Sequence, residues 1–254
     1  MTLNIPSSTA DITPDWLTAA LGADVLQGAQ VTAADVTSLS EGIGFIGEVA
    51  RVELTYDDAP DTAPSTLIAK MPIADPGGRM IGQMLRLYER EANFYEHMAS
   101  ELKIRVPRCF HNAADVEAVQ FCLLLEDLGG LATIDQRDGA DFEQAASILR
   151  TIASFHARWD GGRGDKFDWL PRMNDPMMIG FADRYDDAHA ALLEAIPDKV
   201  DPQMDANTAR LAPHRVALAD QVAALPSGVT SHPLTRSLSN FGEEPICFGP
   251  RSVC

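Results

Sequence analysis

Residues 42–56 read GIGFIGEVARVELTY, and this stretch decides the fold. Its first six residues form a GxGxxG pattern whose glycines are Gly42, Gly44 and Gly47. In a dinucleotide-binding fold these glycines open a helix. Here apolar and polar residues alternate after the third glycine, which predicts a strand. The stretch therefore indicates either an ordinary hairpin turn or a glycine loop that covers nucleotide phosphates between two antiparallel strands.

The rest of the chain changes from strand-like to helical patterns along its length. Further strands are predicted at 30–39, 66–71, around 105–111 and at 119–126. Helices are predicted at 13–22, 79–102, 141–160, roughly 179–195 and 205–225. A β-rich half with one long helix followed by a helical half predicts an α+β fold with two lobes, joined near residues 127–130.

A lysine and a glutamate occur where apolar residues are expected. Lys70 lies in the otherwise apolar strand TLIAKMP, and Glu91 lies on the apolar face of the predicted helix 79–102. A carboxylate on such a face needs a cation, and Lys70 is the nearest upstream cation in an apolar setting. The pair is either a structural ion pair or a kinase-type arrangement in which the lysine meets phosphates. An edge-strand charge is a further interpretation of Lys70.

Composition excludes several classes of partner. The chain has 20 Lys and Arg against 37 Asp and Glu, a net charge of −17. Such acidity argues against nucleic acids and anionic membranes, whose phosphates would repel the protein. The N-terminal sequence MTLNIPSSTAD lacks the basic and apolar regions of a signal peptide, and the four cysteines form no CxxC pair. These features predict a cytoplasmic protein without a zinc site or a disulfide framework.

Taken together, the motifs resemble a known group of phosphotransferases. The motifs are, in chain order, Gly42/Gly44/Gly47, Lys70, Glu91 with Phe94-Tyr95, Leu125-Glu126-Asp127-Leu128, Phe155-His156-Ala157 with Trp159, and Trp169-Leu170-Pro171. In this order they are similar to the aminoglycoside phosphotransferase and choline-kinase-like superfamily, and most similar to its ecdysteroid-kinase-like (CHK kinase-like) branch and bacterial relatives. The resemblance covers roughly residues 10–225.

The resemblance implies a protein-kinase-like two-lobed fold and an ATP- and Mg²⁺-dependent transfer of phosphate to a hydroxyl of a small molecule. It implies that the three glycines cover the ATP phosphates, that Lys70 contacts them and that Glu91 holds Lys70. Backbone groups of Glu126 and Leu128 would bind adenine. The expected partners are a nucleotide and a small-molecule alcohol of unidentified structure. The expected domains are a nucleotide-binding lobe at 1–128, a partial helical lobe at 129–225 and a degenerate catalytic-loop region at 226–254.

The last of these regions departs from the family pattern. The family has a catalytic loop His-Gly-Asp-x-x-x-x-Asn; here His232 matches, but Pro233 and Leu234 replace Gly and Asp, and Asn240 comes one residue late. No magnesium carboxylate follows, so no metal ligand is assigned. Residues 226–254 also contain no Asp and carry no net charge. Either they are a polar tail, or the chain is a truncated or frame-disturbed copy of a kinase.

Three functional hypotheses follow. The first is an ATP-dependent small-molecule phosphotransferase, with impaired catalysis in this chain because both catalytic carboxylates are missing. The second is an inactive nucleotide-binding, pseudokinase-like or scaffold protein. The third is an unrelated α+β binding protein whose glycine turn is coincidental. The acceptor, the residual activity and the oligomeric state are not determined by the sequence.

Overall fold

The computed structural model describes residues 3–39, 46–131, 133–134, 139–159, 163–170, 184–211, 214 and 247–248. The chain forms two compact units: Met1–Arg158 with Pro233–Cys254, and Trp159–His232. The first unit contains an antiparallel five-stranded sheet with helices, and the described part of the second unit is helical. The predicted α+β class is confirmed.

The elements follow the predicted order with shifted boundaries. The strands are β1 (Val31–Ser38), β2 (Gly47–Tyr56), β3 (Thr66–Pro72), β4 (Cys109–Asp115), β5 (Gln120–Glu126), β6 (Thr133–Ile134) and β7 (Cys247–Phe248). The α-helices are α1 (Pro14–Leu26), α2 (Pro76–Met84), α3 (Leu87–His97), α4 (Phe142–Trp159), α6 (Tyr185–Ala195) and α7 (Pro202–Leu211). Short 3₁₀ helices lie at Thr9–Asp11, Ala99–Glu101, Arg163–Lys166 and Pro197–Lys199.

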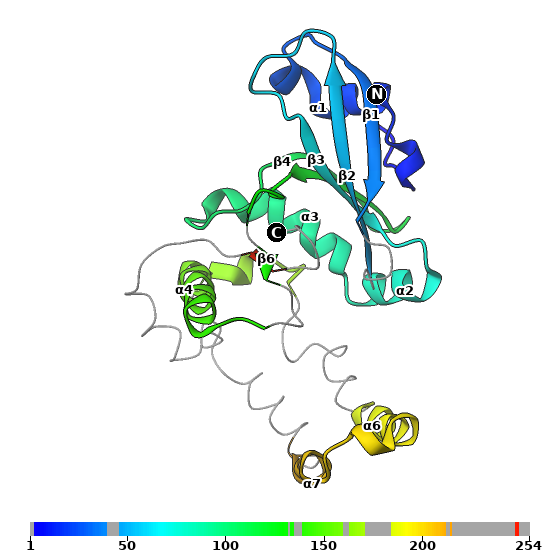
Figure 1. The fold of residues 1–254 in the computed structure, drawn as a ribbon, viewed down its shortest axis with the longest axis vertical. Coiled ribbons are helices and arrows are strands. Elements are labelled where there is room, and N and C mark those ends of the chain that lie inside the picture. The colour runs from blue at the N-terminus through cyan, green and yellow to red at the C-terminus, as the bar shows by residue number, and fades with distance from the viewer. Residues whose placement is uncertain are drawn as a thin grey trace. The chain divides into compact units, whose positions relative to one another are not determined.

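The large sheet has the strand order β1-β2-β3-β5-β4, and every neighbouring pair is antiparallel. Figure 1 labels β1, β2, β3 and β4 of this sheet. Successive side chains of a strand point to opposite faces. In β3, Leu67, Ala69 and Met71 join the buried cluster formed with α1, whereas Ile68 joins the cluster formed with α3. Lys70 shares the parity of Ile68, so it lies on the α3 face of the sheet.

Helix α1 covers the other face and continues further than predicted. The predicted start is confirmed, since the Thr13 side chain accepts a hydrogen bond from the Trp16 amide at 3.2 Å. The predicted end at Gly22 corresponds to a break in the helical backbone. Gly22 adopts a φ of 67° inside the element, and the helix resumes and ends at Leu26. Leu26 is buried in the core, so the additional turn removes apolar surface from water.

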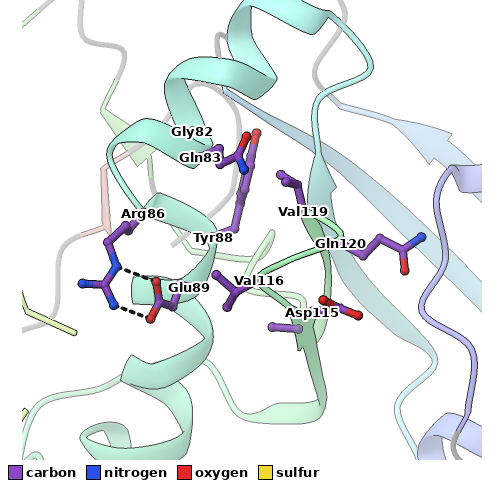
Figure 2. A pocket seen from close by; sticks show the side chains of 10 residues that line it. Gly82, Gln83, Arg86, Tyr88, Glu89, Asp115, Val116, Val119 and Gln120 are labelled. Atoms are coloured by element: carbon purple, nitrogen blue, oxygen red, sulfur yellow. Dashed lines mark hydrogen bonds and ion pairs between the residues drawn. The ribbon is translucent and has the colours of Figure 1, made fainter. Parts of the chain in front are cut away.

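The single helix predicted at 79–102 is wrong, because the structure has two helices there. Arg86 adopts a left-handed φ of 53° and ends the continuity between α2 and α3. The Tyr88 ring then packs against Gly82, where a Cβ atom would lie only 2.5 Å from the ring, and Arg86 pairs with Glu89 (Figure 2). The predicted apolar stripe consequently divides: Met84 on α2 is 40% exposed, whereas Tyr88 on α3 is 8% exposed.

The β4–β5 hairpin lies later in the chain than predicted. Strand β4 occupies Cys109–Asp115 instead of residues around 105–111, and it pairs with β5 through Asp115 and Gln120. The turn ends at Val119, whose φ is 53°. This turn conformation sets the pairing register, which the apolar pattern alone does not contain.

His111 of β4 provides a pH-dependent contact between the sheet and α1. Its ring packs edge-on against Trp16, with the centroids 5.3 Å apart, and burial lowers the pKa of His111. Because the unfolded chain binds this proton more readily, stability is expected to be full above the unfolded pKa of about 6.5 and to fall as the pH decreases below it.

Urea unfolding between pH 7.5 and 5.0 measures this effect. We expect His111→Gln to flatten the decline in unfolding free energy, whereas a change of the exposed His97 to Gln leaves the decline in place. An equal decline in the wild type and in His111→Gln would assign it to other groups.

In the second unit, α6 falls within the predicted helical range 179–195, whereas α7 begins at Pro202, before the start of the predicted range 205–225. Residues 179–183, 212–213 and 215–225 of these ranges lie outside the described residues. The small parallel pair β6–β7 belongs to the first unit. Across the part of the chain that the structure describes, no helix has both the length and the apolarity required to cross a bilayer.

Candidate functional site

The α3 face of the sheet brings Lys70 and Glu91 together. Lys70 Nζ donates to Glu91 Oε1 at 2.6 Å, and the two side chains are 23% and 33% exposed. Strand β3 places Lys70 between Val49 of β2 and Leu123 of β5 in the register. The ion pair predicted from the sequence is therefore present, and both side chains remain partly exposed to solvent.

Helix α3 is fixed on the sheet by contacts on both sides of Glu91. Tyr88 and Ala92 are buried among Phe121 and other residues of the sheet. The Asn112 side chain of β4 donates to the Ala92 carbonyl at 2.9 Å. Burial and the negative charge of Glu91 raise the pKa of Tyr95, one turn further along the helix. The carboxylate is thus held by a helix that cannot shift without disturbing the core.

The glycine segment reaches this site at its C-terminal end. Gly42 and Gly44 lie outside the described residues, and Gly47 is the first residue of β2, opposite Pro72 of β3. The Ile46 carbonyl accepts hydrogen bonds from the Ile73 amide at 3.2 Å and from the Tyr88 hydroxyl at 2.5 Å. The start of β2 is thereby joined to both β3 and α3.

The segment after β5 offers a backbone donor. The Glu126 amide donates to the Arg108 carbonyl at 2.8 Å, so only its carbonyl is a candidate for binding a ligand. Leu128 is 9% exposed, and its carbonyl accepts from Leu131 at 2.8 Å. Among the described residues, no acceptor meets the Leu128 amide. A buried amide without an acceptor is costly, and a nucleobase acceptor would satisfy it.

The Glu126 side chain is bound by two arginine residues of the same unit. It accepts from the Arg105 guanidinium at 2.5 Å and from the Arg108 amide at 3.0 Å. The hydrogen bond from Arg105 holds the pKa of Glu126 below its usual range. The carboxylate is therefore engaged by the protein itself, so it is not a candidate for binding a ligand.

An ion pair that sequence reasoning missed holds the same segment. Arg51 Nε lies 2.8 Å from Asp127 Oδ2, and the Asp127 side chain is 8% exposed. The Gly129 amide donates to Asp127 Oδ1 at 2.8 Å. A Cβ atom at Gly129 would lie 2.4 Å from the Arg51 guanidinium, so glycine leaves room for the pair. In the sequence, the one indication of this ion pair was Asp127 itself, an acid that directly follows a buried strand and precedes Gly129-Gly130.

The other predicted site residues cannot be placed. His232 and Asn240 of the degenerate catalytic loop lie outside the described residues. Within the described ranges, no group of three or more His, Cys, Asp or Glu side chains is arranged to hold a metal ion. No magnesium ligand is therefore assigned among the described residues, and no reaction step is derived through the metal.

Comparison with known proteins supports the resemblance drawn from the motifs. Residues 41–158 match the model of the ecdysteroid kinase-like family. A search of curated proteins finds no match to the chain. The matched range contains Gly47, the Lys70–Glu91 pair, Glu126 at the end of β5 and Leu128. Over residues 41–158, the chain is therefore similar to the ecdysteroid kinase-like family, as the motifs indicated.

Proposed function

We propose that the first unit binds ATP and that the protein is a kinase-like phosphotransferase acting on a hydroxyl of a small molecule. The observation that carries the proposal is the ion pair between Lys70 and Glu91, 2.6 Å apart on the face of the sheet that the glycine segment borders. The family match supports the phosphotransferase class, since its members are kinase-like. We further propose residues 1–128 as the nucleotide-binding lobe and the cytoplasm, where ATP is supplied, as the setting.

Each group has a distinct task in the proposed ATP complex. The Lys70 ammonium binds phosphate oxygens, and Glu91 keeps the ammonium in place. The Leu128 amide and the Glu126 carbonyl bind the adenine edge. Kinase-like families generally use Mg²⁺ with ATP, and the ion would neutralise charge on the phosphates. Phosphoryl transfer depends on such positioning and charge neutralisation, so ATP binding is the part of the activity to which the described residues contribute.

An inactive nucleotide-binding protein is the second candidate. It is favoured by one observation, the presence of Pro233 and Leu234 where the family loop has Gly and Asp. Loss of that Asp removes the group that orients the substrate hydroxyl. Both candidates share the ATP site and differ only in the transfer of phosphate.

Two measurements on the complete chain separate the candidates. The first is the shift in thermal unfolding caused by ATP, with and without Mg²⁺. The second is ADP formation in the presence of small alcohols, sugars and amino alcohols. A shift with acceptor-dependent ADP formation supports the phosphotransferase, and a shift without it supports the inactive binder. The absence of any shift would contradict both.

The variant Gly47→Ala tests whether glycine is required at this position by a bound ligand or by the fold itself. A Cβ atom at this position would lie 3.5 Å from the Met71 carbonyl, an ordinary contact, so the folded chain tolerates alanine. If phosphates approach this backbone, the added methyl group interferes with them. We expect the midpoint of thermal unfolding without ligand to change by less than 2 °C and ATP affinity to fall about tenfold, a loss of about 1.4 kcal/mol. Unchanged ATP affinity in calorimetry would remove Gly47 from the site.

A further inference from the structure

Tyr88 occupies a position from which it contacts two parts of the proposed ATP site. It lies on α3 three residues before Glu91, so the two residues lie on neighbouring positions of the helix surface. Its hydroxyl donates to the Ile46 carbonyl at 2.5 Å, and the residue is 8% exposed. One helix therefore carries both the partner of Lys70 and a donor to the residue before Gly47.

Packing around the Tyr88 ring fixes the direction of its hydroxyl. The ring stacks on Phe121, with the centroids 5.7 Å apart and an angle of 29° between the planes. On the α2 side it fills the space above Gly82, as Figure 2 shows. Because both neighbours restrict the ring, its hydrogen bond with Ile46 is a defined feature of the core.

The pocket beside Tyr88 is too small to be a ligand site itself. Its volume is about 30 Å³, and it lies between the α2–α3 bend and the β4–β5 turn (Figure 2). A single buried water needs roughly 10–15 Å³, so the pocket has room for about two waters and not for a nucleotide. The role of Tyr88 therefore lies in its contact with Ile46 and not in this pocket.

The Ile46 carbonyl is the point at which three elements meet. It accepts from Tyr88 of α3 and from Ile73, just after β3, and it immediately precedes the first residue of β2. Lys70 is on β3 and Glu91 is on α3. A change in the contact between Tyr88 and Ile46 would therefore move the start of β2 relative to the ion pair.

We propose that Tyr88 is a positioning residue for phosphate binding. It holds Ile46 and Gly47 in register with the Lys70–Glu91 pair, so that the backbone and the ammonium meet the same phosphates. The proposal rests on the proposed function, because it requires ATP to bind at Lys70. It concerns the phosphate end of the nucleotide and leaves the base end, at Leu128, unaffected.

The test compares Tyr88→Phe with the wild type in the binding of ATP and of adenosine. Phenylalanine preserves the ring and removes only the hydroxyl. In the variant, ATP must order Ile46 and Gly47 on binding, and we expect a decrease of about 3- to 10-fold in ATP affinity, within the range of one neutral hydrogen bond. Adenosine affinity should stay within twofold, because adenosine has no phosphate. Isothermal titration calorimetry on the complete chain measures both affinities.

Tyr56→Phe is the matched control. The Tyr56 hydroxyl also donates to a backbone carbonyl, that of Pro64, at 2.5 Å, but from the opposite end of β2. Both variants lose one comparable hydrogen bond, and only Tyr88→Phe is expected to weaken ATP binding. Equal ATP affinities of the two variants would overturn the role of Tyr88. Failure of the wild type to bind ATP would instead contradict the proposed function.

Discussion

Replacing Lys70 with alanine is expected to abolish the stabilisation that ATP gives the wild-type chain. The Lys70 ammonium is the one side-chain cation that we propose for the phosphates, and without it Glu91 would present an unpaired carboxylate to them. At a ligand concentration 100 times its Kd, the wild type gains about 2.7 kcal/mol in unfolding free energy. We expect the variant to gain almost none of this in thermal unfolding with ATP.

The design needs a control for charge and a control for the ion pair. Lys103→Ala removes an equal charge from an exposed position, and we expect its shift with ATP to match that of the wild type. Glu91→Gln retains Lys70 but removes its anchor, so an intermediate shift is expected. Each ATP shift is compared with the same variant without ATP, which separates binding from any loss of stability. A full shift in Lys70→Ala would remove this residue from the site.

Replacing Arg51 with methionine is expected to cost the fold about 2–4 kcal/mol. The change leaves the carboxylate of Asp127, 8% exposed, without its cation, while the Gly129 amide still donates to it. A buried charge that loses its partner is strongly destabilising because water does not replace the partner. Methionine retains most of the apolar stem of arginine, so the loss reports the charge.

Arg105→Met is the matched control for this prediction. Arg105 pairs with the neighbouring Glu126 at 2.5 Å, but the two side chains are 43% and 33% exposed. Exposed pairs contribute about 0–1 kcal/mol, so this variant should be nearly as stable as the wild type. Urea unfolding of both variants gives the comparison. Similar losses in the two would show that the burial of Asp127 does not govern the strength of its pair.

The sheet and the ion pair were predictable because each leaves a local pattern. Alternation in residues 48–56 and the apolar runs of β3 and β5 predict strands. Lys70 and Glu91 stand out because each interrupts an apolar surface, and burial of one charge requires the other. These patterns depend only on spacing along the chain, so they can be recognised without knowledge of the packing.

The bend between α2 and α3 and the role of Tyr88 were not predictable from spacing. Leu85 and Arg86 are good helix formers, so their types do not predict a break. The left-handed backbone at Arg86 is stabilised by the tertiary packing of Tyr88 over Gly82. In the apolar stripe, Tyr88 is indistinguishable from a core residue. Its hydroxyl has a function only because the Ile46 carbonyl lies within reach.

The Arg51–Asp127 pair escaped prediction for a related reason. Its partners are separated by 76 residues, and each occurs in an ordinary context, a polar position of a strand and a strand end. Arg51 and Asp127 come within ion-pair distance only because β2 and β5 are the two neighbours of β3 in the sheet. Long-range polar pairs of this kind depend on topology, which periodicity does not encode.

Amide hydrogen–deuterium exchange with and without ATP tests the central claim, ATP binding by the first unit, most directly. The Leu128 amide meets no acceptor among the described residues, so a bound adenine would give it one and slow its exchange. We predict slower exchange in peptides containing Leu128 and in those spanning 46–49, and unchanged exchange in the β2–β3 turn at 57–65. Unchanged exchange at Leu128 under saturating ATP would contradict the account.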